Sequence, residues 1–418
     1  MNHLLHTPDG VRDIYNEECR RRNYLADKLQ KALNLYGYQD IQTPSFEFFD
    51  IFNRERGTVS SRNMYKFFDR EGNTLVLRPD ITPSIARAVA KYFSDEKIPL
   101  RFSYCGNTYI NNVGLKGRMD ETTQIGAELV MDPGIEADAE IIALAVHMLQ
   151  EAGLEDFQID IGHVALFKAL CEEASLSEED AQTLKELVNG KNYFGVESFI
   201  EGRSLEGEAA LMLLRLPELF GSADVIGRAK EMTTNPAAME VLAYLEDLYK
   251  LITLYGFEKY VTIDLGMLSE YNYYTGIIFR GYTYGTGDAI VKGGRYDQLI
   301  GQFGKAAASV GFATVLDELM LAMERQKIDV SSGPSQSMVL YASEYHEQAV
   351  RTAASLRSIA RSVCIVKEDC DLTLEDYLQY CKRYHIDSIL RLTGKDTLEK
   401  IDVDDGSRQV MPVPDFIS

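Results

Sequence analysis

The sequence predicts an α+β fold: an antiparallel sheet with flanking helices and a helical insertion, followed by a small α/β domain. Three observations support this prediction. Several segments alternate apolar and polar residues as strands do, a long leucine-rich stretch separates two groups of them, and strand and helix patterns alternate after a polar linker. At 418 residues the chain is too long for a single compact core, so two or three domains are expected.

The first part of the chain combines one amphipathic helix with several strand patterns. Residues 14–36 place Leu25, Leu29 and Leu33 among charged residues, which predicts a helix that Gly37 ends. The stretches YQDIQTPSFEFFDIF and MYKFFDREGNTLVLRPD alternate apolar and polar residues, and the turn at residues 70–73 predicts a β-hairpin. Further predicted strands are LRFSYCGNTYI, TTQIGAELVM, FQIDIG, YVTIDLG, TGIIFRGYT and DAIVKGG.

Composition changes along the chain predict its domain organisation. The leucine-rich, acidic stretch at about residues 164–255 has almost no strand signal and reads as a helical insertion between two halves of a mixed sheet. The polar segment at 328–336 contains Gly333 and Pro334 and is the best linker in the chain. We therefore expect a first domain over residues 1–327 and a small α/β domain over residues 337–418.

Charge and cysteine content exclude several classes of protein. The chain has 43 Lys and Arg against 64 Asp and Glu, a net charge of −21, which disfavours nucleic acid and membrane surfaces as partners. Its six cysteines form no CxxC pair, so neither a disulfide framework nor a metal site is expected, and no cofactor is implied. Without a signal-like N-terminus or a run of about 18 apolar residues, a cytoplasmic protein is expected.

The first candidate cluster is LRPDITPSIAR, residues 77–87. An extended segment places Arg78 and Asp80 on one face, just before a turn that opens a helix. A structural alternative is that Thr82 is only the N-cap of that helix, with Pro83 at its first position and the charged pair on the surface.

The second candidate cluster is TTQIGAELV, residues 122–130. In a strand, Gln124, Gly126 and Glu128 point to one side, and an amide and a carboxylate around a glycine leave a small acidic hollow. Such a hollow suits an ammonium group or an imidazole N–H. The alternative is a strand face that is simply exposed to solvent.

The third candidate cluster is SEYNYYTGIIF, residues 269–279, followed by VKGGRYD. Tyr273 and Tyr274 are either core aromatics with their hydroxyls near water or part of a pocket wall. Gly293 and Gly294 before Arg295 allow a tight turn or a close approach of the backbone.

Together and in this order, these segments resemble the catalytic core of histidyl-tRNA synthetases, a class II aminoacyl-tRNA synthetase family built on an antiparallel sheet with helices. The resemblance covers about residues 5–325. Its segments are TPDGVRD, GYQDIQTPSFE, MYKFFDREGNTLVLRPD, the GR…Q.G.E stretch at residues 117–128, NYYTG, GGRYD and VGFA. The C-terminal domain resembles the anticodon-binding domain of that family in layout, with a weaker match.

The resemblance also implies a site that has lost its synthetase activity. In the family, arginines bind the ATP phosphates and the aminoacyl carboxylate, because adenylate formation needs positive charge at the phosphorus centre. Carried over residue by residue, these arginines fall on Ile110, Asp120, Ser269 and Glu318. A chain without these four cations is not expected to be an enzyme.

The amino-acid end of the pocket is retained in type. By the same resemblance, positions around the histidine ammonium and imidazole fall on Asp80, Thr82, Gln124, Glu128, Tyr273 and Tyr274. Because Ser269 replaces an arginine that can face the ligand carboxylate, Arg118 or Arg295 are candidates for that role.

A lost phosphate site beside a retained histidine pocket resembles the regulatory subunits of ATP phosphoribosyltransferase, an inactive synthetase-like family. In that family the chain partners a short-form catalytic subunit in the first step of histidine biosynthesis and is associated with feedback inhibition by histidine. The resemblance implies a homodimer, formed through the first-motif segment, inside a larger hetero-oligomer. Two alternatives stay open: an active histidyl-tRNA synthetase, and a synthetase-like protein that binds tRNA or another partner. A further alternative concerns the ligand: histidine acts either in this pocket, or mainly at the partner's own site or across the shared interface, in which case the pocket is only structural.

Overall fold

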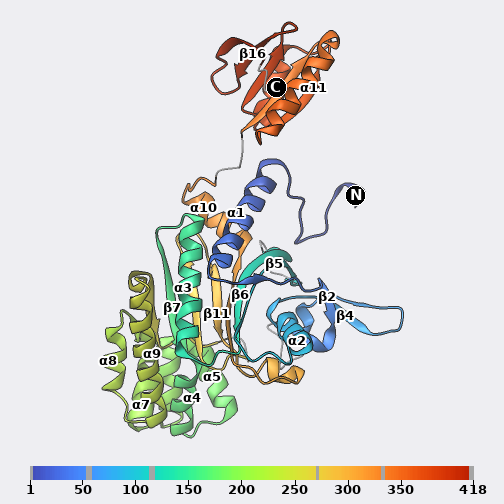
Figure 1. The fold of residues 1–418 in the computed structure, drawn as a ribbon. Helices are drawn as coiled ribbons and strands as arrows, with labels where there is room; N and C mark the ends of the chain where they lie inside the picture. The colour runs from blue at the N-terminus through green and yellow to red at the C-terminus, as the bar shows by residue number, and fades with distance from the viewer. Residues whose placement is uncertain (1–2, 53–58, 113–117, 270–272, 331–334, 414–418) are drawn as a thin grey trace. The chain divides into compact units, whose positions relative to one another are not determined.

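The chain forms two compact units in the computed structural model (Figure 1). The structure describes residues 3–52, 59–112, 118–269, 273–330 and 335–413. One unit comprises residues 1–12 and 25–329, and the other comprises residues 13–24 and 330–418. The second boundary falls inside the segment expected to be a linker, of which residues 331–334 lie outside the described residues. The sequence did not predict that residues 13–24 belong with the second unit.

The first unit is built on a nine-stranded sheet. In spatial order its strands are β1 (Gln39–Asp40), β5 (Leu100–Tyr109), β6 (Glu121–Val130), β12 (Ser309–Val315), β11 (Val291–Arg295), β10 (Ile277–Thr283), β7 (Phe157–His163), β9 (Val261–Asp264) and β8 (Phe220–Gly221). All neighbours from β5 to β7 are antiparallel, whereas β1 pairs in parallel with β5 and β9 in parallel with β7. The predicted antiparallel sheet is therefore confirmed.

The N-terminal segments also follow the sequence pattern. Helix α1 (Asn16–Leu35) ends just before Gly37, whose φ of 81° is one that glycine adopts without strain. Strands β2 (Phe46–Phe48), β4 (Thr74–Leu77) and β3 (Lys66–Phe68) form a separate antiparallel sheet in the order β2-β4-β3. The predicted hairpin is the β3–β4 pair, and its turn is held by Asp69, which accepts the N–H of Glu71 and of Asn73.

Helices cover the large sheet and form the insertion. Helix α3 (Ile135–Ala152) packs on β6, β11 and β12, and α10 (Leu316–Arg325) packs on β6 and β12. The insertion, drawn in green in Figure 1, consists of α4 (Val164–Glu173), α5 (Glu178–Asn189), α6 (Tyr193–Gly202), α7 (Gly207–Arg215), α8 (Asp224–Lys230) and α9 (Pro236–Leu254). It also contributes β8 to the sheet edge, a strand too short to leave an alternating pattern.

The second unit is a five-stranded sheet with two helices. Its strand order is β14 (Ser362–Lys367), β13 (Gln336–Tyr341), β15 (Ser388–Leu392), β16 (Thr397–Asp402) and β17 (Arg408–Pro412). Strand β13 is parallel to both β14 and β15, and β15, β16 and β17 are antiparallel. Helices α11 (His346–Ser358) and α12 (Leu374–Arg383) complete the predicted α/β domain. The sequence reading missed β16, because its two buried residues, Leu398 and Ile401, are three positions apart and leave no period-two alternation.

None of the helices in the described parts of the chain combines the length and hydropathy that crossing a membrane requires.

Candidate ligand-binding site

A cavity of about 410 Å³ lies over one face of the large sheet. Its walls come from β6, β12, the start of α2 (Thr82–Tyr92), the start of α10 and the segment before β10. The structure brings together on these walls all six predicted pocket residues: Asp80, Thr82, Gln124, Glu128, Tyr273 and Tyr274. Residues 270–272 of the SEYNYYTG motif and Gly117 of the GR stretch lie outside the described residues.

The floor of the cavity is hollowed by glycines. Register pairs Glu128 of β6 with Gly311 of β12, and Gly126 with Ala313. A Cβ atom at Gly311 would lie 1.7 Å from Glu128 Oε2, and one at Gly126 would lie 2.5 Å from the Tyr104 hydroxyl oxygen. Only glycine leaves room for these side chains, so the predicted hollow is present. The solvent-facing alternative is wrong, because Glu128 is only 1% exposed.

Glu128 is the central acceptor of the cavity. Its carboxylate accepts a hydrogen bond of 2.6 Å from Thr82 Oγ1 and a second one from the Tyr296 hydroxyl. Burial raises the pKa of Glu128 to about 8, and the nearby charge of Asp80 acts in the same direction against the two hydroxyl donors. A ligand N–H that reaches this carboxylate therefore favours its ionised form.

Asp80 and Thr82 hold the start of α2 against this site. Asp80 Oδ1 accepts the backbone N–H of Ile81 at 2.7 Å and that of Thr82 at 3.3 Å. Thr82 is the first residue of the helix, and its hydroxyl donates to Glu128. The alternative that Thr82 is merely the N-cap is therefore wrong, since its side chain links α2 to β6.

Gln124 adds a second acceptor. Its Oε1 atom is buried and has no hydrogen-bond partner among the described residues. A buried acceptor without a partner is costly, and a ligand donor such as an ammonium group would satisfy it.

The two tyrosines have different environments. Tyr273 is 7% exposed and belongs to a buried cluster, with its ring 5.9 Å from that of Tyr296 in an edge-on arrangement. Tyr274 is half-buried, and its ring lies 4.7 Å from Tyr273. A Cβ at Gly294 would lie 2.8 Å from the Tyr274 ring, so this glycine allows the ring to rest on β11. Tyr273 is thus mainly a core aromatic, and Tyr274 is the wall of the cavity.

The four positions at which the sequence resemblance implies lost arginines lie around the same space. Ile110, Asp120 and Glu318 line the cavity, and Ser269 lines a hollow next to it. Asp120 accepts hydrogen bonds from the Tyr65 hydroxyl and from a backbone N–H, so it is part of the wall. The carboxylates of Asp120 and Glu318 repel a triphosphate, and the neutral side chains of Ile110 and Ser269 provide no charge that would bind it.

The two candidate carboxylate partners differ sharply. Arg295 is buried and donates to Asp138, Asp297 and two backbone carbonyls; the Asp138 distance is 2.9 Å from Nε. Asp138 belongs to α3, on the side of the sheet away from Glu128, so the geometry does not support Arg295 as a ligand partner. Arg118 does line the cavity, is 61% exposed and lies 3.6 Å from Asp288.

Sequence reasoning missed three residues of this region: Tyr296, Arg280 and Lys292. Tyr296 belongs to the GGRYD motif, of which only the glycines and the arginine had been considered. Because alternate residues share a face, its spacing from Gly294 was a usable signal. Arg280 and Lys292 lie in strands that were read only for their apolar residues.

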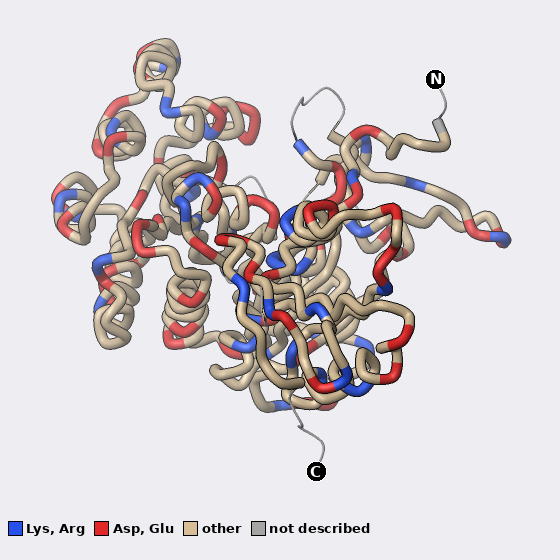
Figure 2. Tube along the Cα trace, turned by 90° about the horizontal axis from the view of Figure 1, so that it is seen from above, with Lys and Arg blue, Asp and Glu red and all other residues tan. Residues whose placement is uncertain are grey.

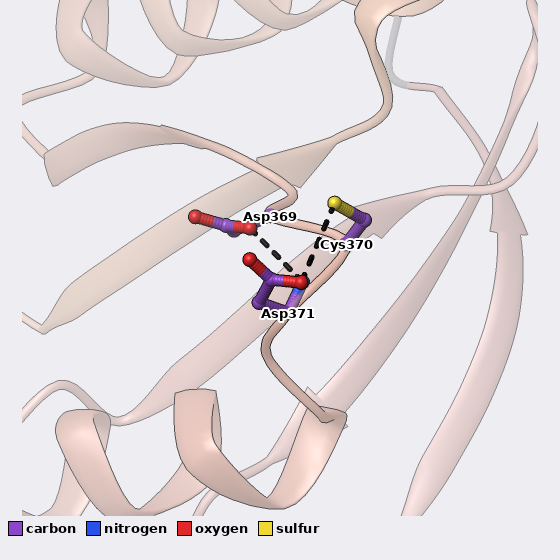
Figure 3. Close-up of side chains that lie close together, drawn as sticks. All are labelled: Asp369, Cys370 and Asp371. Atoms are coloured by element: carbon purple, nitrogen blue, oxygen red, sulfur yellow. Dashed lines mark hydrogen bonds between the residues drawn. The ribbon is translucent and has the colours of Figure 1, made fainter.

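A group of possible metal ligands lies elsewhere, in the loop between β14 and α12. Asp369, Cys370 and Asp371 are exposed and close together (Figure 3). Their contacts are those of a local turn: Asp369 accepts the N–H of Asp371 at 3.0 Å, and the Cys370 thiol lies 3.9 Å from an Asp371 oxygen. Nothing beyond this proximity points to a bound ion.

Comparison with known proteins first defines the class. A family model described as histidyl-tRNA synthetase matches residues 10–319. The solved histidyl-tRNA synthetase of a Nostoc species has the same fold, with a TM-score of 0.82 over 98% of this chain and 97% of that chain, at 19% identity. The fold and the cavity therefore define a histidyl-tRNA synthetase-like protein of class II architecture, as the sequence predicted.

More similar relatives define the family. The ATP phosphoribosyltransferase regulatory subunit of Acetivibrio thermocellus is 36% identical over 99% of this chain and 98% of its own length. That of Clostridium acetobutylicum is 37% identical over 96% and 98%. A Bacillus halodurans structure described as an ATP phosphoribosyltransferase regulatory subunit/histidyl-tRNA synthetase has a TM-score of 0.83 and 29% identity, over 94% of this chain and 99% of that chain. The chain belongs to the family of ATP phosphoribosyltransferase regulatory subunits.

Proposed function

We propose that this chain is the non-catalytic regulatory subunit of an ATP phosphoribosyltransferase in the first step of histidine biosynthesis, and that it acts in the cytoplasm. It binds free histidine in the cavity over Glu128 and transmits that binding to a short-form catalytic subunit. The observation that carries the proposal is one buried carboxylate, held by two hydroxyls, in a cavity whose phosphate-binding positions are neutral or acidic.

The chemistry of the cavity matches that of free histidine. An imidazole N–H is a donor for Glu128, and the half-buried ring of Tyr274 provides an aromatic wall. The ammonium group suits Asp80 and the unsatisfied oxygen of Gln124. Each hydrogen-bond donor of histidine, the imidazole N–H and the ammonium group, therefore has an acceptor in the cavity.

The same cavity lacks what amino-acid activation needs. Removing a single preorganised donor from a transition-state site costs on the order of 10²-fold in rate. Four positions have changed here, at Ile110, Asp120, Ser269 and Glu318, and even strongly non-additive losses leave no useful adenylation. This absence of cations supports a regulatory and not a catalytic role.

The charge distribution supports a protein or small-molecule partner over tRNA. Acidic residues outnumber basic ones by 64 to 43, and Figure 2 shows the basic positions interspersed among acidic ones along the trace. Binding to a nucleic-acid backbone relies on clustered cations.

The small β2-β4-β3 sheet supports self-association. It exposes four phenylalanines, Phe46, Phe48, Phe67 and Phe68, between 37% and 72%, close to the first-motif segment. A patch of exposed aromatic side chains is typical of an interface. We propose that it belongs to a homodimer within a larger hetero-oligomer. Phe48→Glu is expected to lower the mass measured by analytical ultracentrifugation at micromolar concentration, whereas Leu254→Glu, at an 83% exposed position in α9, is not.

The decisive experiment is a rate measurement with the short catalytic subunit of the same organism. Phosphoribosyl transfer to ATP is followed with and without this chain across a histidine titration. Activation together with inhibition by histidine is the expected result. By linkage, if histidine changes the affinity between this chain and the catalytic subunit by some factor, the catalytic subunit changes the affinity for histidine by the same factor. No effect on rate or histidine sensitivity would contradict the proposal. Histidine-dependent pyrophosphate exchange into ATP would instead favour an active synthetase.

Glu128→Gln tests whether the histidine acts in this cavity. The activated rate is expected to persist while the inhibition shifts to at least tenfold higher histidine, because a charged acceptor is lost. Unchanged inhibition would place the effective histidine site on the partner or at the interface.

A further inference from the structure

A second hollow, of about 330 Å³, adjoins the histidine cavity. The two spaces share part of their walls, including Tyr274, Arg118, Asp288 and Lys292. Among the described residues, the second hollow is lined by three cations, Arg118, Arg280 and Lys292, and by one carboxylate, that of Asp288. Its lining is therefore positive, although the chain as a whole carries a net charge of −21.

Two of these cations face each other across a pair of strands. Arg280 of β10 is the register partner of Lys292 of β11, and such opposed residues project from the same side of the sheet. Like charges in this arrangement repel, so an anion between them would be stabilising. The neighbour of Arg280 on β7, Asp160, accepts hydrogen bonds from Gln158 and Thr262 and does not line the hollow.

Asp288, whose carboxylate is the one that lines the hollow among the described residues, is shared between two cations. Asp288 lies 3.2 Å from Lys292 Nζ and 3.6 Å from Arg118 Nη2. Arg280 Nη2 donates to the Leu268 carbonyl at 3.4 Å, a long hydrogen bond next to Ser269. The short, 7% exposed side chain of Ser269 leaves open the space in which its synthetase counterpart carries an arginine.

We propose that this hollow is an anion-binding site in which Arg280 and Lys292, with Arg118 at its edge, bind the carboxylate of the amino acid held in the adjoining cavity. The inference rests on the proposed function, and it supplies the carboxylate partner that Arg295 does not provide. A phosphate group of a separate small molecule presents the same anionic oxygen chemistry, so the test distinguishes the two sources.

The experiment is isothermal titration calorimetry on the full-length chain at fixed pH and ionic strength. The three probes are L-histidine, L-histidinamide, which lacks the carboxylate charge, and inorganic phosphate. Arg280→Gln and Lys292→Gln are compared with Arg351→Gln and Lys168→Gln, which remove exposed cations outside the hollow. Circular dichroism verifies that each variant folds. If either Arg280→Gln or Lys292→Gln does not fold, the conclusion is drawn from the other variant.

The wild type is expected to bind histidine at least tenfold more tightly than histidinamide, the scale of a charge-assisted contact. That preference should fall towards one in Arg280→Gln and in Lys292→Gln and persist in both controls. If instead only phosphate binding depends on Arg280 and Lys292, the anion site stands with phosphate as its ligand. The anion site stands in this way even if histidine does not bind. In that case only the proposal that the chain binds histidine is refuted.

The inference is overturned if folded Arg280→Gln and Lys292→Gln keep the wild-type preference for histidine over histidinamide and the wild-type response to phosphate. It is also overturned if the wild type binds neither histidine nor phosphate. In the first case the proposal that the cavity over Glu128 binds histidine still stands, and only the proposal of an anion site in the second hollow is refuted.

Discussion

The Glu128 carboxyl makes the stability of the first unit depend on pH in a direction unusual for an acid. Its folded-state pKa is raised from 4.5 to about 8, because burial penalises the charged form. The folded chain then holds this proton more tightly than the unfolded chain does. The stabilisation is complete below about pH 4.5 and is lost as the pH rises towards 8.

Glu128→Gln is the substitution that removes this titration. Glutamine has nearly the same volume, is neutral at every pH, and keeps a carbonyl that accepts from Thr82 or Tyr296. At about 1.4 kcal/mol per pKa unit, the wild type should lose roughly 2–3 kcal/mol of unfolding free energy between pH 6 and pH 9 through this one group. The variant should lose none of that part.

Urea unfolding at pH 6, 7, 8 and 9 measures the difference. The chain contains no tryptophan, so circular dichroism is the appropriate signal. The expected result is that the free energy of unfolding of Glu128→Gln, minus that of the wild type, increases by roughly 2–3 kcal/mol from pH 6 to pH 9. Glu347→Gln, at an exposed position on α11, is the matched control and should show no such trend.

A second readout is proton release on ligand binding. If a histidine N–H requires the ionised carboxylate, binding at pH 7 should release a proton from wild-type Glu128 and none from Glu128→Gln. Calorimetry in two buffers of different ionisation enthalpy detects this proton. Parallel pH profiles of the two proteins would refute the reasoning, because they would mean that Glu128 is already ionised at pH 6 in the folded chain.

Two further substitutions test the packing around the site. Gly311→Ala should lower the free energy of unfolding, measured in urea, by about 3 kcal/mol or more, because the new Cβ would lie 1.7 Å from a Glu128 oxygen. Gly227→Ala is the control and should be neutral or slightly stabilising, because no atom lies within 4 Å of its Cβ position. Equal effects of the two substitutions would contradict the close-approach argument. Arg295→Met should cost about 3–5 kcal/mol at pH 7, because it leaves the buried carboxylate of Asp138 without its cation, although the Tyr244 hydroxyl still donates to it. Arg351→Met, from an exposed ion pair, should cost less than about 1 kcal/mol. A similarly small loss for Arg295→Met would show that Asp138 does not need a cationic partner.

Local patterns predicted much of the fold. The period-two alternation in residues 122–130 correctly placed Gln124 and Glu128 on one face, because strand geometry alone determines it. The end of α1 at Gly37 and the β3–β4 hairpin followed from turn chemistry in the same way. Short or charged strands such as β8 and β16 were missed, since their stability comes from neighbours that the sequence does not display.

Tertiary packing decided what the sequence left open at the site. Arg78 was considered as a pocket or surface residue, yet it is 5% exposed and donates to the carbonyls of Thr43 and Asn107. Arg295 was one of two candidates, with Arg118, for binding the ligand carboxylate in place of the arginine that Ser269 replaces. The actual partner of Arg295 is Asp138 of α3. The sequence does not show this pairing, because it depends on how α3 packs on the distant strands of the sheet.

The insertion also has a consequence for how the chain folds. Ile161 of β7 and Phe279 of β10 are register partners, although the whole helical insertion lies between them. Closing so long a loop from an unfolded chain is entropically slow, and folding rates fall as contacts become less local. Within the insertion, its first helix α4 packs on its last helix α9. Collapse of the insertion therefore brings its two ends together and shortens the path that β7 and β10 must close. We therefore expect the helices of the insertion to form before β7 and β10 join in the central sheet.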